Sequence, residues 1–191
     1  MTITLKEICK TYDKEPVLDH LSLSISKGQT TCLMGSSGCG KTTLANLLLG
    51  LLKPDKGSIT GLDTSQIAAV FQEDRLCENL NSIKNIAIVC PKSVSKKQIL
   101  THLLEVGLTE TDSMKPVSEL SGGMKRRVAL VRALITSNQM IILDEPFKGL
   151  DTTTKGQVIA YIKKYTQGKT LLIITHDKED VALLDAQLIE L

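Results

Sequence analysis

A glycine-rich segment, residues 35–43, has the residue types and the spacing needed to bind phosphate groups. It reads Gly, four residues, Gly-Lys-Thr, and comprises Gly35, Ser36, Ser37, Gly38, Cys39, Gly40, Lys41, Thr42 and Thr43. Glycines let the backbone curl so that successive N–H groups face phosphate oxygens, and the N-terminus of a following helix adds a favourable dipole. In this pattern Lys41 binds the β- and γ-phosphates, and the Thr42 hydroxyl is a ligand of Mg²⁺. The segment predicts a nucleoside triphosphate site, because a strand-like run precedes it and a helical pattern follows it.

Two adjacent acids, Asp144 and Glu145, follow the apolar run 140–143. Ligands bind at the C-terminal ends of strands in open parallel sheets, so a strand here would deliver both carboxylates to a site. We expect Asp144 to hold Mg²⁺ and Glu145 to orient the water that attacks a γ-phosphate. Taken alone, the pair is explained equally well as an exposed boundary between a strand and a turn. Together with the phosphate loop, it indicates nucleotide hydrolysis.

A second anion site is predicted at Ser121-Gly122-Gly123, which opens a helical pattern with Ser121 at the N-cap position. Exposed N–H groups at a helix N-terminus attract anions. The phosphates of one nucleotide are already held by the loop around Lys41, so this site would serve a nucleotide bound to another molecule. An ordinary capped helix would explain the segment if it stood alone.

Short strands alternating with helices are expected to position these residues. Alternating or continuous apolar patterns predict strands at 3–8, 21–25, 30–34, 66–71, 140–143 and 171–175, and 3.6-residue periodicity predicts helices at 42–52, 121–135 and 152–165. Residues 78–120 have a different character, with helices and loops and a capping box from Ser95 to Gln98. This order predicts an α/β fold with a mostly parallel sheet and an inserted helical lobe.

The amino-acid composition argues against several classes of function. The 191 residues fit one domain, and with 42% hydrophobic and 23% charged residues the chain should be globular and soluble. A net charge of +2 and 3% aromatic residues argue against nucleic acid as a partner. The basic run Lys125-Arg126-Arg127 is therefore expected to be a solvated helix face. The five cysteines show no Cys-x-x-Cys spacing, so we expect reduced thiols in a cytosolic protein and neither a disulfide framework nor a zinc site. The densest apolar run, 47–52, is too short to span a bilayer.

From about Ile3 to the C-terminus, these motifs and their order resemble those of ATP-binding-cassette (ABC) ATPases. The resemblance implies that Tyr12 stacks on adenine, and that Gln72 contacts Mg²⁺ and couples the site to the helical lobe. It implies that Asp151, in the loop Gly149-Leu150-Asp151, communicates across a dimer, and that His176 contacts the γ-phosphate. Further, Ser121, Gly122 and Gly123 would close over the ATP of the opposite subunit. Singly, Tyr12 is explained as a core or surface residue, His176 as a turn residue and Gln72 as a solvated strand end.

The implied fold is that of an α/β P-loop NTPase with a mostly parallel central sheet, a reduced N-terminal antiparallel β layer and an inserted helical lobe. One cassette domain would span residues 1–191, with the catalytic core at 1–77 and 121–191 and the lobe at 78–120. Two departures stand out: the segment 54–72 is short, and Met124 replaces the usual glutamine of the signature. Such a methionine is familiar in cassettes similar to nitrate, sulfonate and taurine importers.

The resemblance implies an ATP-hydrolysing subunit of a membrane transporter that imports a small solute. Expected partners are a second copy in a homodimer, permease subunits and an extracytoplasmic solute-binding protein, with the chain in the cytoplasm on the inner face of the membrane. An alternative is a soluble cassette that remodels a cytosolic assembly such as iron–sulfur cluster machinery. A chromosome- or repair-type cassette would need very long coiled coils, which the chain lacks. A nucleotide kinase would have no use for the signature, for residues 149–151 or for His176.

Overall fold

The computed structural model describes residues 2–191, which form two compact units. The first unit comprises the chain up to Ile67 together with Gln139–Asp144 and Gly168–Leu191. The second comprises Ala68–Asn138 and Glu145–Gln167. Among the described residues, no helix has both the length and the apolar character needed to cross a bilayer.

The first unit contains an antiparallel sheet of order β2-β1-β4, made of β1 (Thr2–Tyr12), β2 (Glu15–Ser26) and β4 (Lys56–Thr60). Asp13 and Lys14 join β1 to β2, both with positive φ (47° and 73°), as a tight two-residue hairpin requires. Ile3, Leu5 and Ile8 point into the core, and a shift in pairing register between Leu5 and Ile8 keeps Ile8 on the buried face.

A parallel sheet of order β5-β6-β7-β3-β8 carries the C-terminal strand ends at which ligands are expected. Its strands are β3 (Thr30–Met34), β5 (Ile67–Val70), β6 (Met140–Asp144), β7 (Thr170–Ile174) and β8 (Gln187–Glu190). Four of them lie wholly in the first unit, and β5 begins there at Ile67. Every residue of β6 and β7 is buried, as in strands covered on both faces.

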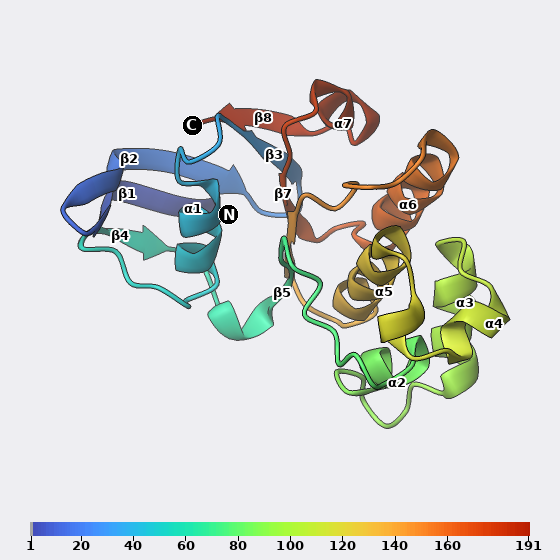
Figure 1. The fold of residues 1–191 in the computed structure, drawn as a ribbon. Coiled ribbons are helices and arrows are strands. Elements are labelled where there is room, and N and C mark those ends of the chain that lie inside the picture. Colours follow the sequence, from blue (N-terminus) through green and yellow to red (C-terminus); the bar gives the residue numbers. More distant parts are fainter. Residues whose placement is uncertain (1) are drawn as a thin grey trace. The chain divides into compact units, whose positions relative to one another are not determined.

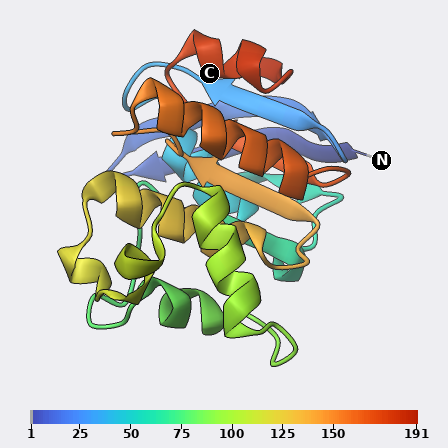
Figure 2. The ribbon, with the colours of Figure 1, turned by 90° about the vertical axis from the view of Figure 1, so that its right-hand side faces the viewer.

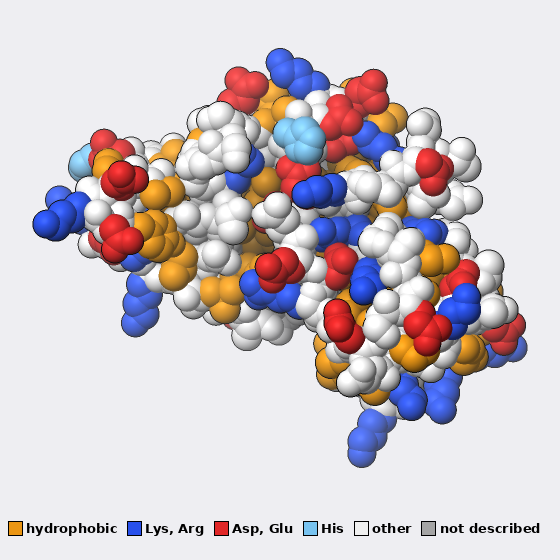
Figure 3. Space-filling view, in the orientation of Figure 1, with side chains coloured by type: hydrophobic (Ala, Val, Ile, Leu, Met, Phe, Trp, Pro, Cys, Tyr) orange, Lys and Arg blue, Asp and Glu red, His pale blue; other side chains and the backbone are white. Residues whose placement is uncertain are grey.

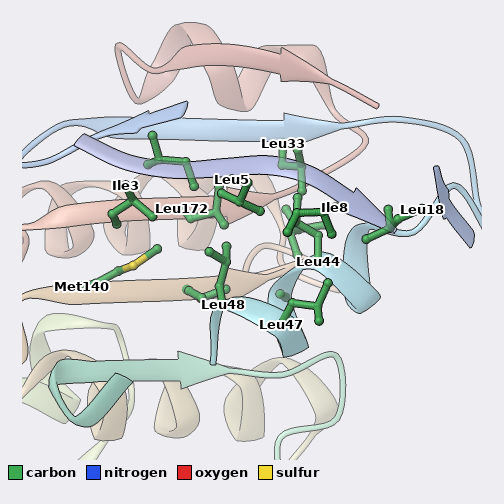
Figure 4. Close-up of a cluster of buried hydrophobic side chains, with 14 residues drawn as sticks. Ile3, Leu5, Ile8, Leu18, Leu33, Leu44, Leu47, Leu48, Met140 and Leu172 are labelled. Carbon is green, nitrogen blue, oxygen red and sulfur yellow. The ribbon is translucent and has the colours of Figure 1, made fainter. Parts of the chain in front are cut away.

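The hydrophobic core of the first unit fixes the helix that follows the phosphate loop. Helix α1 (Lys41–Leu48) buries Leu44, Leu47 and Leu48 against apolar side chains of β1, β3, β6 and β7 (Figure 4). Helix α7 (Lys178–Leu183) and the 3₁₀ turn Thr64–Gln66 complete this unit (Figure 1). Because α1 is buried along one side, the loop before it is held in a fixed position on the unit.

The second unit is helical. It contains α2 (Ser82–Ala87), α3 (Lys96–Glu105), α4 (Glu110–Met114), a 3₁₀ turn (Val117–Glu119), α5 (Gly122–Leu134) and α6 (Thr152–Tyr165), drawn from green to orange in Figure 2. The predicted capping box is present: Ser95 accepts from the Gln98 N–H, and the Gln98 side chain accepts from the Ser95 N–H. Helix α5 packs against α2 and α3. Since α6 in turn contacts α5, both helices group with residues 78–120 in one compact unit, whereas the sequence-based prediction places 121–191 with the catalytic core.

Several elements differ from the sequence-based expectation. Strands β1 and β2 are longer than predicted, and the helix expected over 42–52 ends at Leu48. The short segment 54–72 supplies β4, so the reduced antiparallel layer has three strands. Residue Gly57 makes this pairing possible, because a Cβ there would lie 2.4 Å from the carbonyl oxygens of Lys6 and Glu7.

Candidate functional site

The loop between β3 and α1 has a shape that only glycine permits at two positions. Gly40, the residue before α1, has φ 98°, and a Cβ on it would lie 2.6 Å from Leu18 Cδ2. Gly35 has φ 155°, and its Cβ would lie 2.6 Å from Cys39 Sγ and 2.9 Å from the Leu191 carbonyl oxygen. Side chains at these positions would meet both backbone strain and collision. The sequence pattern thus corresponds to a curled loop at a helix N-terminus.

The lysine of the loop is held close to the loop backbone. Lys41 Nζ donates to the carbonyl oxygens of Gly35 (2.8 Å) and Ser36 (2.7 Å), and Cys39 Sγ lies 3.7 Å away. Ser36, Ser37 and Gly38 are exposed, so solvent and phosphate oxygens can reach this part of the loop. A compact positive charge therefore stands beside an exposed glycine-rich loop, which is the combination that binds phosphate.

Two oxygen donors in the same unit suit a magnesium ion. Thr42 lies in the first turn of α1 and is exposed, and Asp144 ends β6 with 7% of its surface exposed. Hydroxyl and carboxylate oxygens are the hard ligands that Mg²⁺ prefers, with water completing its shell. Both donors are oxygens and therefore fit Mg²⁺.

Glu145 follows Asp144 directly and begins the next stretch of the second unit. Its φ is 49°, a left-handed backbone that non-glycine residues rarely adopt, and the Lys148 N–H donates to its carbonyl oxygen (3.2 Å). Such a conformation costs about 1–3 kcal/mol and is concentrated at functional sites. The strained turn gives Glu145 a side-chain direction that a continued strand would not.

His176 is exposed on a turn that its neighbours hold in place. The Thr175 hydroxyl donates to the buried Asp180 carboxylate and accepts from the Asp177 N–H (3.1 Å). Asp177 in turn caps α7 by accepting from the Glu179 N–H. The histidine is therefore exposed to solvent after the C-terminal end of β7, and its contact with a γ-phosphate stays a prediction.

Tyr12 ends β1 and is 41% exposed, beside the hairpin turn. Lys10 Nζ lies 5.8 Å from the centre of its ring. The ring is therefore accessible from solvent, and its stacking on adenine stays a prediction.

Gln72 follows β5 in an exposed segment whose backbone is held by helix α5. Arg126 donates from Nη1 to the Phe71 carbonyl oxygen (2.6 Å) and from Nη2 to the Gln72 carbonyl oxygen (2.5 Å). It also pairs with Asp74, with 3.2 Å between Nε and Oδ1. Burial raises the pKa of Asp74, and the Arg126 charge opposes that rise. One arginine thus fixes the backbone on both sides of Gln72 while the glutamine side chain stays exposed.

The expectation that Lys125-Arg126-Arg127 forms a solvated face is wrong. Arg126 is only 5% exposed. Arg127 is half-buried and donates to the carbonyl oxygens of Gly123 (3.2 Å) and Val106 (2.8 Å). Helical periodicity could have predicted this burial, because position 126 lies on the same helix face as the apolar residues Leu130 and Ala133. On the face drawn in Figure 3, Lys and Arg side chains are interspersed with Asp and Glu.

A second arginine, Arg132, extends the same support and was missed by the sequence reasoning. It donates to the carbonyl oxygens of Asp74 (2.9 Å) and Arg75 (2.8 Å). The Arg75 guanidinium lies 3.7 Å from the centre of the Phe71 ring. Helix α5 therefore holds the segment 71–75 through hydrogen bonds from two of its arginines to the segment's carbonyl oxygens.

The signature and the 149–151 loop meet within the second unit. Ser121 caps α5 by accepting from the Met124 N–H (3.3 Å), and a Cβ on Gly123 would lie 3.1 Å from the Gly149 carbonyl oxygen. Asp151 caps α6 by accepting from the Thr154 N–H, and hydrogen bonds from Thr154 lower its pKa. By contrast, a Cβ on Gly122 would meet no atom within 4 Å, so the outer side of the signature is open.

The expected site residues fall into two groups. Tyr12, the phosphate loop, Asp144 and His176 belong to the first unit, whereas Gln72, the signature, Asp151 and Glu145 belong to the second.

The chain is similar to known proteins in family, in sequence and in structure. A model of the ABC transporter family matches residues 18–148. The ergothioneine transport ATP-binding protein EgtV of Helicobacter pylori (strain G27) is 32% identical over 205 residues, covering 99% of this chain and 96% of EgtV. The sulfate/thiosulfate import protein CysA 2 of Chromobacterium violaceum is 38% identical over 193 residues, but this chain spans only 52% of it. The taurine import protein TauB of Roseobacter denitrificans is 37% identical, covering 93% of this chain and 70% of TauB.

Solved structures give the same result. The dimeric structure of MJ0796, a bacterial ABC transporter cassette, matches with a TM-score of 0.84 and 29% identity, covering 99% of this chain and 94% of that one. A dimeric post-hydrolysis state of the same cassette, bound to ADP and Pi, matches with a TM-score of 0.84 and 28% identity. The chain belongs to the ABC transporter family and is one of its ATP-binding and ATP-hydrolysing cassettes.

Proposed function

We propose that this cassette powers import of a small solute through a separate permease, by closing as a head-to-tail homodimer around two MgATP. The observation that carries the proposal is the open, capped helix N-terminus at Ser121 and Gly122, present in addition to a complete phosphate loop. A single cassette needs only one of these two anion sites for its own ATP. The relatives include proteins named for import of taurine and of sulfate or thiosulfate.

Within each half-site, Tyr12 stacks on adenine, the loop N–H groups surround the phosphates and Lys41 neutralises the β- and γ-oxygens. Thr42, Asp144 and Gln72 would hold Mg²⁺, which would supply charge stabilisation of the phosphates. Glu145 orients and polarises the attacking water, and His176 contacts the γ-phosphate from the end of β7. The remaining loop residues, Ser36, Ser37, Cys39 and Thr43, contribute backbone contacts.

The signature of the partner copy would complete the site. Its helix N-terminus brings N–H groups and a positive dipole end to the γ-phosphate of the opposite ATP. Gly123 rests against Gly149, so a displacement of the signature is passed to the loop that leads into Asp151. Loss of the γ-phosphate after hydrolysis removes the anion that holds the two copies together, and the dimer reopens.

Coupling to a permease would pass through the segment at Gln72, with residues 78–120 as the helical lobe of the cassette. Arg126 and Arg132 bind this segment to the signature helix α5, so both must move together. The permease would hold the cassette peripherally on the cytoplasmic face of the membrane. A solute-binding protein would belong to the same import system.

ATP turnover tests the catalytic assignment. Glu145→Gln should bind MgATP normally but hydrolyse it at least ~100-fold more slowly, since a positioned general base contributes about that much. Glu179→Gln, which changes an exposed acid on α7, is the matched control and should keep full turnover. Undiminished turnover by Glu145→Gln would refute the assignment.

Affinity purification of the tagged chain from its own membranes tests the coupling to transport. Recovery of a polytopic membrane protein together with the cassette is expected. Recovery of a cytosolic assembly without any membrane protein would contradict the proposal and favour a remodelling cassette.

A further inference from the structure

We propose that Cys9, Asp19 and His20 form a binding site for a thiophilic divalent cation such as Zn²⁺, with Glu7 orienting the histidine. The site lies on the antiparallel sheet and shares no residue with the proposed magnesium ligands Thr42, Gln72 and Asp144.

The pairing of β1 with β2 brings the three ligand residues together. Ile8 pairs with Leu21 and Lys10 with Leu18, so Asp19 and His20 both lie opposite the single residue Cys9. This is the two-against-one arrangement of a β-bulge, which turns side chains away from their usual alternation. As a result, one ligand atom from each of the three residues lies within 4.8 Å of the others.

The distances agree with one cation among these atoms. His20 Nε2 lies 3.9 Å from Asp19 Oδ1, and two ligands of tetrahedral zinc lie about 3.4 Å apart when their bonds are about 2.0–2.1 Å. Cys9 Sγ accepts from the His20 N–H (3.4 Å), which holds the sulfur beside the histidine backbone. His20 and Asp19 therefore need to approach each other by under an ångström to bind one cation.

Glu7 and Ser22 support the histidine from behind. Glu7 Oε2 lies 2.7 Å from His20 Nδ1, and the Ser22 hydroxyl donates to Glu7 Oε1 (3.1 Å) while accepting from the Glu7 N–H (2.9 Å). With the proton on Nδ1 shared with this carboxylate, Nε2 presents its lone pair on the side of Asp19. A carboxylate behind a ligating imidazole is the usual way in which proteins fix a metal-binding histidine.

The backbone is strained at two of these residues. Glu7 has φ 51° and His20 has φ 47°, both left-handed although neither is glycine. Gly57 of β4 makes room for the bulge, since a Cβ there would lie 2.4 Å from the Glu7 carbonyl oxygen. Backbone strain of this kind is found mainly at functional sites. The mechanism of ATP hydrolysis proposed above gives no role to Glu7 or His20.

The donor set selects the kind of metal. Thiolate sulfur and imidazole nitrogen favour zinc and similar cations over Mg²⁺ or Ca²⁺. Three protein ligands leave a fourth position for water, and His20 is 61% exposed on its side chain, so a cation can enter from solvent. The sequence predicted no zinc site because the ligands show no Cys-x-x-Cys spacing and meet only across the bulged strand pair.

Cobalt spectroscopy on the reduced, nucleotide-free chain tests the proposal. Titration with Co²⁺ should give one thiolate-to-cobalt charge-transfer band at one equivalent, which added Zn²⁺ removes. Cys9→Ser should abolish the band, and His20→Gln should weaken binding at least ~10-fold. Glu7→Gln should weaken binding ~10–100-fold, the usual effect of losing the partner of a ligating histidine.

Matched controls separate this site from other thiols. Cys77→Ser changes an exposed cysteine of the second unit and should leave the band intact. The circular dichroism spectra of the variants should match that of the parent chain, since the altered side chains are exposed or half-buried. Absence of a band, or a band that survives Cys9→Ser, would overturn the proposal. Equal losses in Cys9→Ser and Cys77→Ser would also overturn it, because they would show binding to accessible thiols in general.

Discussion

Replacing Arg126 by methionine should destabilise the second unit strongly, although the residue belongs to a run of three basic side chains. The change keeps most of the side-chain volume but removes the hydrogen bonds to the Phe71 and Gln72 carbonyl oxygens and the ion pair with Asp74. Breaking a buried pair by removing one partner costs about 3–5 kcal/mol. Because the 71–74 segment is partly exposed, water will satisfy some of the groups left behind, and we expect about 2–4 kcal/mol.

Urea denaturation followed by circular dichroism measures this cost as a shift of the midpoint for the second unit. Lys125→Met removes the neighbouring charge from a half-buried position and should change stability by about 0.5 kcal/mol or less. A second change, Asp74→Asn, should cost less in Arg126→Met than in the parent chain, since its charge partner is already absent. Equal stability of Arg126→Met and Lys125→Met would refute the assignment of Arg126 as the anchor of the Gln72 segment.

Three further predictions concern the phosphate loop, helix α6 and a half-buried histidine. Gly40→Ala should abolish ATP binding in equilibrium dialysis, because the new Cβ collides with Leu18 at φ 98°, whereas normal binding would show that the loop tolerates a side chain. Gly156 lies within helix α6, and a Cβ on it would meet no atom within 4 Å, so Gly156→Ala should raise the free energy of unfolding by about 1 kcal/mol. A lower free energy of unfolding would contradict the open environment. Burial lowers the pKa of His102, which contacts the Tyr161 hydroxyl, so stability should be constant above about pH 7 and fall as pH drops below the ordinary value of 6.5. Urea titrations at several pH values should show this fall in the parent chain and not in His102→Gln; an identical fall in both would exclude His102 as its cause.

The parts of the fold that rest on local patterns could be predicted from the sequence. The run 140–143 is apolar because β6 is buried on both faces, and the capping box at Ser95 begins a helix wherever it occurs. Strand β4 was not predicted because Lys56–Thr60 contains one apolar residue, Ile59, and because its own Gly57, which permits the close approach to β1, is in sequence a turn signal.

The residues proposed for the chemistry of the site carry more sequence signal than the residues that hold their backbone in place. Loop glycines, paired acids and the signature have fixed spacings, since phosphate and water demand the same geometry in every such site. Arg126 and Arg132 act through backbone carbonyl oxygens far along the chain, which carry no sequence signal. The meeting of Cys9 with His20 depends on the register of a bulged strand pair, and no spacing rule encodes that register.

The most direct test of the central claim is the oligomeric state of Glu145→Gln, measured by size-exclusion chromatography with light scattering. We predict a monomer without nucleotide and a dimer with MgATP, because the uncleaved γ-phosphate holds the signature of the opposite copy. A further Ser121→Arg change should abolish the dimer while ATP binding persists. A Glu145→Gln chain that binds MgATP but stays monomeric, or a dimer that survives Ser121→Arg, would contradict the composite site.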